Sequence, residues 1–138
     1  MFAVNKYLKQ VLLFSFLSLS ASVYALSPPA GDWKETWGAI APSDKDNIFG
    51  AAVGEDSKQE AEQIALADCK ARGGAACKVE LAYQNQCIAM VTGKKQFKLK
   101  SADSIAAATQ QAMADCQQDD TACRVAYSVC TLMRFVPY

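Results

Sequence analysis

Apolar and polar positions divide the chain into an uncharged N-terminal run and a series of short amphipathic segments. The N-terminal run, residues 11–23, follows Lys6 and Lys9 and ends in the sequence Val23-Tyr24-Ala25. A basic start, an apolar stretch and an A-x-A-type end are typical of a secretory signal peptide. We therefore predict that residues 1–25 are removed on export.

Several of the segments that follow are short and predict β-strands. Apolar runs at residues 37–41 and 47–53 are separated by the polar sequence PSDKD, a pattern typical of a β-hairpin. Later alternating or β-branched segments predict further strands at residues 78–83, 87–92 and 96–100 and at residues 124–136, the last as one long strand or a bent pair.

Two segments repeat apolar residues at helical spacing. Ser57 and Glu60 form a capping box before the first helix, which we expect at about residues 58–70, ended by Gly73-Gly74. Ser101 is expected to cap the second helix, at about residues 102–116. The residues expected to face the core are Ala61, Ile64, Ala65 and Leu66 in the first helix and Ile105, Ala106, Ala108, Ala112 and Met113 in the second.

These helices belong to an internal repeat. The pattern A-x3-A-x-A-D-C ends at Cys69 and returns 47 residues later, ending at Cys116. In each copy a polar connection leads to Cys-Lys-Val or Cys-Arg-Val and then to a tyrosine and a further cysteine. We infer two copies of one supersecondary unit, at about residues 37–92 and 94–136.

All six cysteines follow the predicted cleavage site, and an even number of cysteines in an exported chain indicates disulfides. Six cysteines permit about 15 sets of pairs, so the sequence alone does not fix the connectivity. A cysteine that ends a helix and one that opens the next strand lie within reach of each other when the connection is short. This favours the bridges Cys69–Cys77 and Cys116–Cys123, and leaves Cys87–Cys130 to join the two halves through the sheet.

The pattern as a whole predicts an α+β fold. We expect a lead segment at residues 26–36 and a single domain at residues 37–138, in which two helices pack on one face of a predominantly antiparallel sheet. The domain should consist of two related halves and contain three disulfides. The alanine-rich helices bury little area, so the disulfides should contribute much of the stability.

Composition narrows the function mainly by exclusion. Residues 1–25 carry Lys6 and Lys9 as their only charges, so their removal leaves 113 residues with 12 basic and 14 acidic side chains. Such a balance disfavours general nucleic-acid binding, and no later apolar run approaches the roughly 18 residues of a transmembrane segment. The chain contains no His, which excludes Ser-His-Asp and Cys-His catalysis and most catalytic zinc sites. We expect no cofactor, no metal and no catalytic residues, in a periplasmic or secreted protein.

The cysteine framework resembles a known bacterial family. The matching features are the sequence WGAIA at residues 37–41, Gly50, the helix ending at Cys69, Cys77-x-Val79, Asn85-x-Cys87-x-Ala89, and the second alanine-rich helix with Cys116, Cys123 and Cys130. They are similar to the family called domain of unknown function 4189, over about residues 37–130. The resemblance implies a small exported protein without an agreed enzymatic role, and it supplies no catalytic residues.

A basic cluster is the first candidate site. Lys94, Lys95, Lys98 and Lys100 surround Phe97 and Leu99, an arrangement that suits an anionic partner. The competing interpretation, which we favour, is an edge strand that its lysines protect from aggregation.

Other candidates are single residues or pairs. Trp33 lies in the lead segment, where it is a possible anchor for a partner, whereas Trp37 is expected in the core. Asp68 and Asp115 occupy equivalent repeat positions, which suggests a shared hydrogen-bonding role rather than an acid–base pair. The segment from Asp44 to Gly50 faintly resembles a calcium loop but lacks essential ligands, so we interpret it as a solvated turn.

The leading functional hypothesis is an exported binding protein, for example an inhibitor or immunity protein that blocks a toxin or an envelope enzyme. A disulfide-stapled scaffold without a catalytic constellation suits such a role. The alternative is a His-independent cell-envelope hydrolase that uses carboxylates. The sequence favours the non-enzymatic hypothesis and leaves the oligomeric state open.

Overall fold

The structure is a computed structural model and describes residues 27–138. The predicted signal peptide lies outside the described residues. In chain order the elements are β1 (Gly31–Lys34), β2 (Trp37–Ser43), β3 (Ile48–Glu55), α1 (Lys58–Ala71), β4 (Leu81–Gln84), β5 (Cys87–Thr92), β6 (Phe97–Ala102), α2 (Ile105–Asp119), β7 (Arg124–Cys130) and β8 (Arg134–Pro137).

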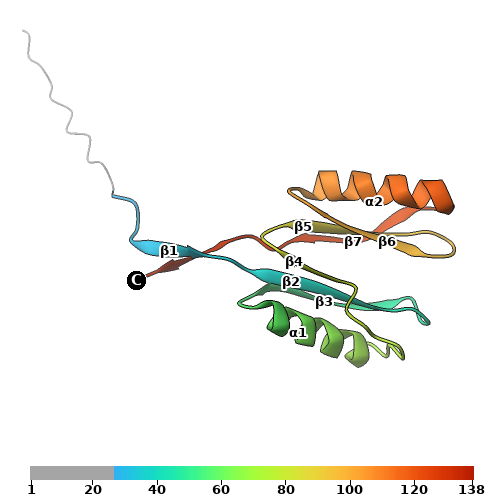
Figure 1. Ribbon diagram of the computed structural model, residues 1–138, viewed down its shortest axis with the longest axis horizontal. Helices are drawn as coiled ribbons and strands as arrows, with labels where there is room; N and C mark the ends of the chain where they lie inside the picture. Colours follow the sequence, from blue (N-terminus) through green and yellow to red (C-terminus); the bar gives the residue numbers. More distant parts are fainter. Residues whose placement is uncertain (1–26) are drawn as a thin grey trace, which may run out of the picture.

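The described strands form three antiparallel sheets, ordered β3-β2-β4, β6-β5-β7 and β1-β8. Figure 1 shows the two three-stranded sheets between the helices, with α1 below and α2 above. The α+β class, the antiparallel pairing and the two helices are confirmed. The structure differs from the expectation in one respect: the helices lie on the outer faces of two stacked sheets rather than on one face of a single sheet.

The two halves share one ββαβ topology. β2, β3, α1 and β4 form the first unit, and β5, β6, α2 and β7 form the second. In each sheet the first strand of the unit is central and is flanked by the second and third strands. The predicted internal relation of the halves is thus confirmed, but β5 opens the second unit instead of closing the first. Its hydropathy fits either place, and only its pairing with β6 and β7 decides between them.

Both faces of the central strands are buried. In β2, Ala39 packs against α1, whereas the next residue, Ile40, packs between the sheets with Ile88 of β5. At one side of this layer Phe49 of β3 packs against Tyr127 of β7, with ring centroids 5.3 Å apart. Burial on both faces explains why β2 and β5 are almost continuously apolar.

Small residues allow α1 to lie close to its sheet. Ala61, Ala65 and Cys69 are fully buried at one face of the helix, at a spacing of four residues. Opposite them, a Cβ atom on Gly50 of β3 would overlap the backbone of Ala65 and Cys69. A residue with any side chain at position 50 would therefore push the helix away.

The expected inner faces of the helices were partly wrong. Ile64 and Ile105 are about 40% exposed, and Ala106 is exposed as well. The buried residues of α2 are Ala108, Ala112 and Cys116, which match those of α1. Each helix is positioned by its alanines and its disulfide-bonded cysteine, because a larger side chain does not fit against the sheet at that distance.

The capping residue of α1 is confirmed, and that of α2 needs correction. The Ser57 hydroxyl accepts a hydrogen bond from the Glu60 backbone N–H at 3.1 Å. In the second unit the equivalent cap is Ser104, which accepts from the Ala107 N–H at 3.1 Å. Ser101, the predicted cap, belongs to β6 and pairs with Ile88, so strand pairing prevails over local helix-capping preference there.

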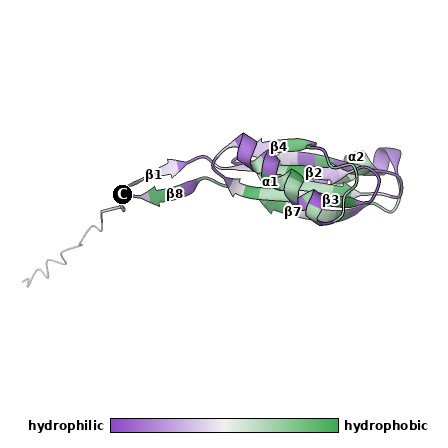
Figure 2. Cartoon of the chain, turned by 90° about the horizontal axis from the view of Figure 1, so that it is seen from below, coloured by the Kyte–Doolittle hydropathy of each residue, from purple (hydrophilic) through white to green (hydrophobic). Residues whose placement is uncertain are grey.

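A two-stranded ribbon of β1 and β8 extends from the sandwich (Figures 1 and 2). Of the two alternatives for residues 124–136, the strand pair is confirmed, as β7 and β8. β1 was not predicted, because four residues carry little pattern. At the base of the ribbon, the hydroxyls of Thr36 and Thr131 are buried and lie 2.6 Å apart. The Gly54 N–H donates to Thr131 Oγ1, and Thr36 Oγ1 donates to the Leu132 carbonyl, so the bonds form a continuous chain.

All three predicted disulfides are present: Cys69–Cys77, Cys87–Cys130 and Cys116–Cys123. The first and third join the end of each helix to the segment after it. Cys87 and Cys130 lie directly opposite each other on β5 and β7. This bridge therefore connects two strands of the second unit rather than the two halves.

Candidate functional site

Two of the four lysines in the basic cluster are engaged by α2. β6 is an edge strand, as the protective interpretation requires. The Lys98 and Lys100 ammonium groups lie 2.5 Å from Asp119 Oδ2 and 2.6 Å from Asp115 Oδ2, respectively. These ion pairs hold both side chains against the helix, so they are not freely available to a partner.

Lys94 and Lys95 lie at the tip of the β5–β6 hairpin and are exposed. Neither is in an ion pair with another residue of the described chain within 4.0 Å. Of the four lysines of the predicted basic cluster, these two are the ones without an ion-pair partner in residues 27–138.

A single buried carboxylate fixes the hairpin tip. Asp120 Oδ2 accepts hydrogen bonds from the backbone N–H groups of Lys95 and Gln96 at 2.8 and 3.1 Å, and Oδ1 accepts from Thr121 at 2.7 Å. The bond from the Lys95 N–H is the main cause that lowers the pKa of Asp120 below its usual value. Because a Cβ atom on Gly93 would overlap this carboxyl group, the glycine is required for the contact.

From the sequence, Asp120 belongs only to the polar connection between Cys116 and Cys123, so its role at the hairpin tip was not predicted. The available signal was the position of the acidic residue directly after the helix, at the end where the hairpin tip also lies. Only the antiparallel register of β5 and β6 places Gly93 and Gln96 beside it.

A shallow groove of about 320 Å³ follows the outer side of β6. It is lined by Glu80, Leu81, Phe97, Lys98, Leu99, Lys100 and Asp115. Apolar residues from β4 and β6 thus lie beside two carboxylates and two ammonium groups. Since Asp115 is paired with Lys100, this groove is an electrostatically balanced surface rather than a basic one.

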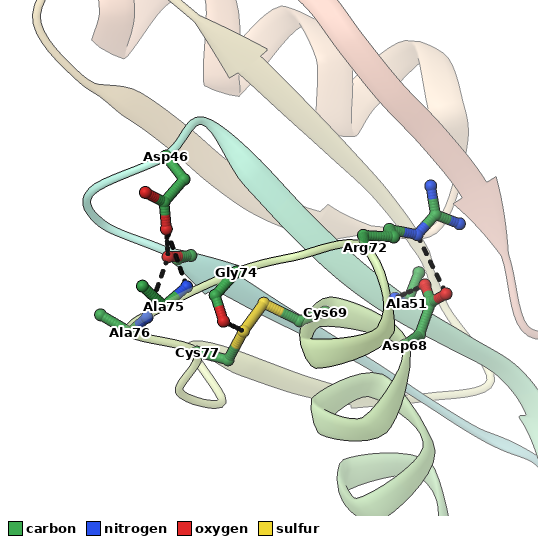
Figure 3. The surroundings of a disulfide bond; sticks show 10 residues. Asp46, Ala51, Asp68, Cys69, Arg72, Gly74, Ala75, Ala76 and Cys77 are labelled. Carbon is green, nitrogen blue, oxygen red and sulfur yellow. Dashed lines mark hydrogen bonds and ion pairs between the residues drawn. A yellow bond between two sulfur atoms is a disulfide. The ribbon is translucent and has the colours of Figure 1, made fainter.

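In the first unit, the turn between the first two strands is likewise held by an aspartate, Asp46. Asp46, in the β2–β3 turn, accepts hydrogen bonds from the Ser43 hydroxyl and from the Ala75 N–H, beyond the disulfide of α1 (Figure 3). The bond from Ala75 is the main cause that lowers the pKa of Asp46. Asp44 is paired with Lys78 at 3.0 Å. These acidic residues stabilise a turn, and no cluster of potential metal ligands occurs in residues 27–138.

Asp68 and Asp115 lie on different helices, on opposite sides of the sandwich, so the structure does not bring them together. Each contacts the neighbouring strand in its own unit. Asp68 accepts from the Ala51 N–H at 3.0 Å and from Arg72, whose hydrogen bond is the main cause that lowers the pKa of this carboxyl (Figure 3). Asp115 instead forms an ion pair with Lys100 of β6. The two aspartates therefore occupy equivalent positions, but one accepts a backbone hydrogen bond and the other pairs with a lysine side chain.

Comparison with known families identifies the repeated domain. The family model described as Domain of unknown function (DUF4189) matches residues 37–130. The chain belongs to this family. No curated protein and no solved structure matches it.

The DUF4189 match covers both ββαβ units and all six cysteines, but neither strand of the terminal ribbon. Trp33, on β1, therefore lies outside the matched residues. Its side chain is 65% exposed and packs against Phe135 of β8, with ring centroids 5.4 Å apart. Leu132 and Met133, which precede β8, and Tyr138, which follows it, are also exposed. Neither helix of residues 27–138 is long and apolar enough to span a bilayer.

Proposed function

We propose that this DUF4189 protein is an exported binding protein that blocks a site on a partner protein, in the manner of an inhibitor or immunity protein. The observation that carries the proposal is the β5–β6 hairpin, whose tip presents Lys94 and Lys95 while Asp120 holds its backbone in place.

Preorganisation is the physical reason why such a hairpin suits binding. Ordering a flexible loop on association costs conformational free energy, and a loop that is already fixed avoids most of that cost. The hairpin is fixed at three points, since the Lys94 N–H also donates to the Thr121 carbonyl at 3.1 Å. The Cys116–Cys123 disulfide holds the helix end and strand start on either side of Asp120.

The charge of the tip indicates the chemistry of the partner. Two adjacent exposed ammonium groups on a protein with a slight acidic excess favour a localised acidic cleft, such as that of a toxin or an envelope enzyme. Three disulfides in the described chain fit an oxidising compartment, which supports a periplasmic or secreted location.

The proposal is tested by capture from periplasmic extract with immobilised mature protein, followed by measurement of affinity for the captured partner. Lys94→Glu/Lys95→Glu should weaken binding at least about tenfold, and wild-type binding should fall as salt is raised. Lys45→Glu/Lys70→Glu, which makes the same charge change at two other exposed sites, should have little effect. Equal loss in both variants, or failure to capture a protein partner, would count against the role of the hairpin.

One observation supports the alternative function, a cell-envelope hydrolase. Glu80 and Asp115 both line the groove beside β6, where a polymer chain could contact two carboxylates. Against it, the Asp115 carboxylate is already engaged in an ion pair with Lys100 at 2.6 Å, so it is not free to contact a substrate. Release of peptidoglycan fragments by the wild type, lost in Glu80→Gln or Asp115→Asn, would favour the hydrolase over the binding protein.

A further inference from the structure

The terminal ribbon has the properties of an incomplete sheet. It consists of two strands of four residues, and it extends beyond the sandwich that contains the core (Figure 2). An isolated two-stranded sheet is marginally stable in water, and a third strand or a packing surface normally completes it. Trp33 nevertheless leaves about two thirds of its surface exposed on this ribbon.

The hydrogen-bond phase of the ribbon leaves a free edge at Trp33. The Tyr138 N–H donates to the Ala30 carbonyl at 3.2 Å, one step before the Gly31–Pro137 pair in the register. In an antiparallel ladder, bonded and non-bonded pairs alternate. The Trp33–Phe135 pair is therefore non-bonded, so the N–H and C=O of Trp33 point away from β8, toward an unpaired edge of the described sheet.

We propose that β1 pairs antiparallel with β1 of a second copy of this chain, with Trp33 of both copies at the two-fold axis. The two Trp33 residues then form a bonded pair, and the ribbons join into a four-stranded sheet in the order β8-β1-β1-β8. On one face the Trp33 and Phe135 rings of both copies form a continuous row, which covers aromatic surface that the monomer exposes.

Charge supports the second copy as the occupant of this edge. In the register centred on Trp33, Asp32 lies directly opposite Lys34 of the second copy, and Lys34 lies opposite its Asp32. Opposite charges at directly facing positions stabilise an antiparallel pair, and a two-fold interface requires such self-complementarity. The neighbouring register, centred on Asp32, would place two aspartates opposite each other and is disfavoured.

The other edge of the ribbon is protected. Pro137 in β8 has no backbone N–H to donate, and prolines are typical of strand edges that do not pair. Arg134 is already engaged with the Asp56 carboxylate and the Gly54 carbonyl. The buried Thr36–Thr131 pair holds the base of the ribbon, so β1 is presented in a fixed direction before association.

Sedimentation equilibrium of the mature chain tests the proposal, up to roughly 200 µM because a small interface is expected to be weak. We expect a monomer–dimer equilibrium that Trp33→Ala weakens at least about tenfold. Ile105→Ala, which removes another exposed apolar side chain from the far helix α2, should leave the equilibrium unchanged. A wild type that is monomeric at every concentration would overturn the proposal, as would a dimer that Trp33→Ala does not weaken.

A charge swap tests the register separately. Asp32→Lys alone and Lys34→Asp alone place like charges opposite each other, so each should weaken the dimer. The double variant Asp32→Lys/Lys34→Asp restores opposite charges at both positions and should recover most of the association. Failure of the double variant to exceed either single variant, with circular dichroism showing that all three are folded, would refute the Trp33-centred register. None of these variants touches the hairpin tip, so the outcome is independent of the proposed binding function.

Discussion

At the scale of single residues, the most informative group is the Asp120 carboxylate, because one side chain organises three backbone donors from two connections. Asp120→Ala leaves those donors without their acceptor and frees the hairpin tip. We expect the melting temperature to fall by at least about 5 °C and the affinity for the partner to fall with it. Asp119→Ala is the matched control, since the neighbouring carboxylate makes only an exposed ion pair with Lys98. Similar losses in both variants would mean that the hairpin is held by something other than Asp120.

The same carboxylates determine how the protein responds to acid. Hydrogen bonds lower the pKa values of Asp46, Asp68 and Asp120 in the folded state. A lowered folded pKa means that the stabilisation is fully present above the unfolded value, near pH 4, and is lost as the pH falls through the folded value. Urea unfolding should therefore show a declining midpoint below about pH 4. Asp120→Asn should show a smaller decline than the wild type, and an unchanged slope would exclude Asp120 as a contributor.

At the scale of elements, the sequence predicted what local chemistry encodes. The Ser57 cap, the cysteine spacing and the apolar run of β5 led to helix α1, the three bridges and a strand with the observed bounds. Local signals failed where pairing decides between alternatives. Ser101 and Ser104 are both plausible caps, and only the pairing of β6 with β5 removes the first. The division into two sheets likewise depends on which strands pair with β5. Because β5 is apolar on both faces, its sequence does not specify those partners.

The closeness of α1 to its sheet gives a prediction at this scale. Gly50→Ala adds a Cβ atom that would overlap the helix backbone at Ala65 and Cys69, so the helix must shift and the Cys69–Cys77 bridge with it. We expect a loss of about 3 kcal/mol in the free energy of unfolding, at the upper end for overpacked cores. Gly54→Ala makes the same chemical change in open space, where a positive φ of 79° is the only obstacle, and should cost about 1 kcal/mol. Chemical denaturation compares the two, and a smaller loss at Gly50 than at Gly54 would contradict the packing argument.

At the scale of the whole molecule, two short bridges act within the units and one long bridge acts on the second sheet. In each unit, a bridge links a cysteine in the last turns of the helix to a cysteine seven or eight residues further along the chain. The alanine-rich helix buries little area there. The Cys87–Cys130 bridge spans 43 residues and lies next to Gln86 and Thr131, whose backbone groups bond to each other at 2.8 Å. The bridge thus lies within the second sheet, directly beside the base of the terminal ribbon. The sandwich itself is held by the apolar layer around Ile40 and Ile88, with no disulfide across it in residues 27–138.

This arrangement predicts different consequences for the loss of each bridge. In the chain-entropy model the long bridge contributes roughly 4 kcal/mol and each short one about 2.5 kcal/mol, before any change in native packing. Cys87→Ala/Cys130→Ala should therefore lower the urea midpoint more than either short pair. Because this bridge adjoins the ribbon, hydrogen exchange in the same variant should accelerate first at Thr131 and in β8, while α1 keeps its protection. Earlier exchange in the layer around Ile40 would show that the long bridge also secures the contact between the two units. A larger loss from Cys69→Ala/Cys77→Ala would contradict the dependence on loop length.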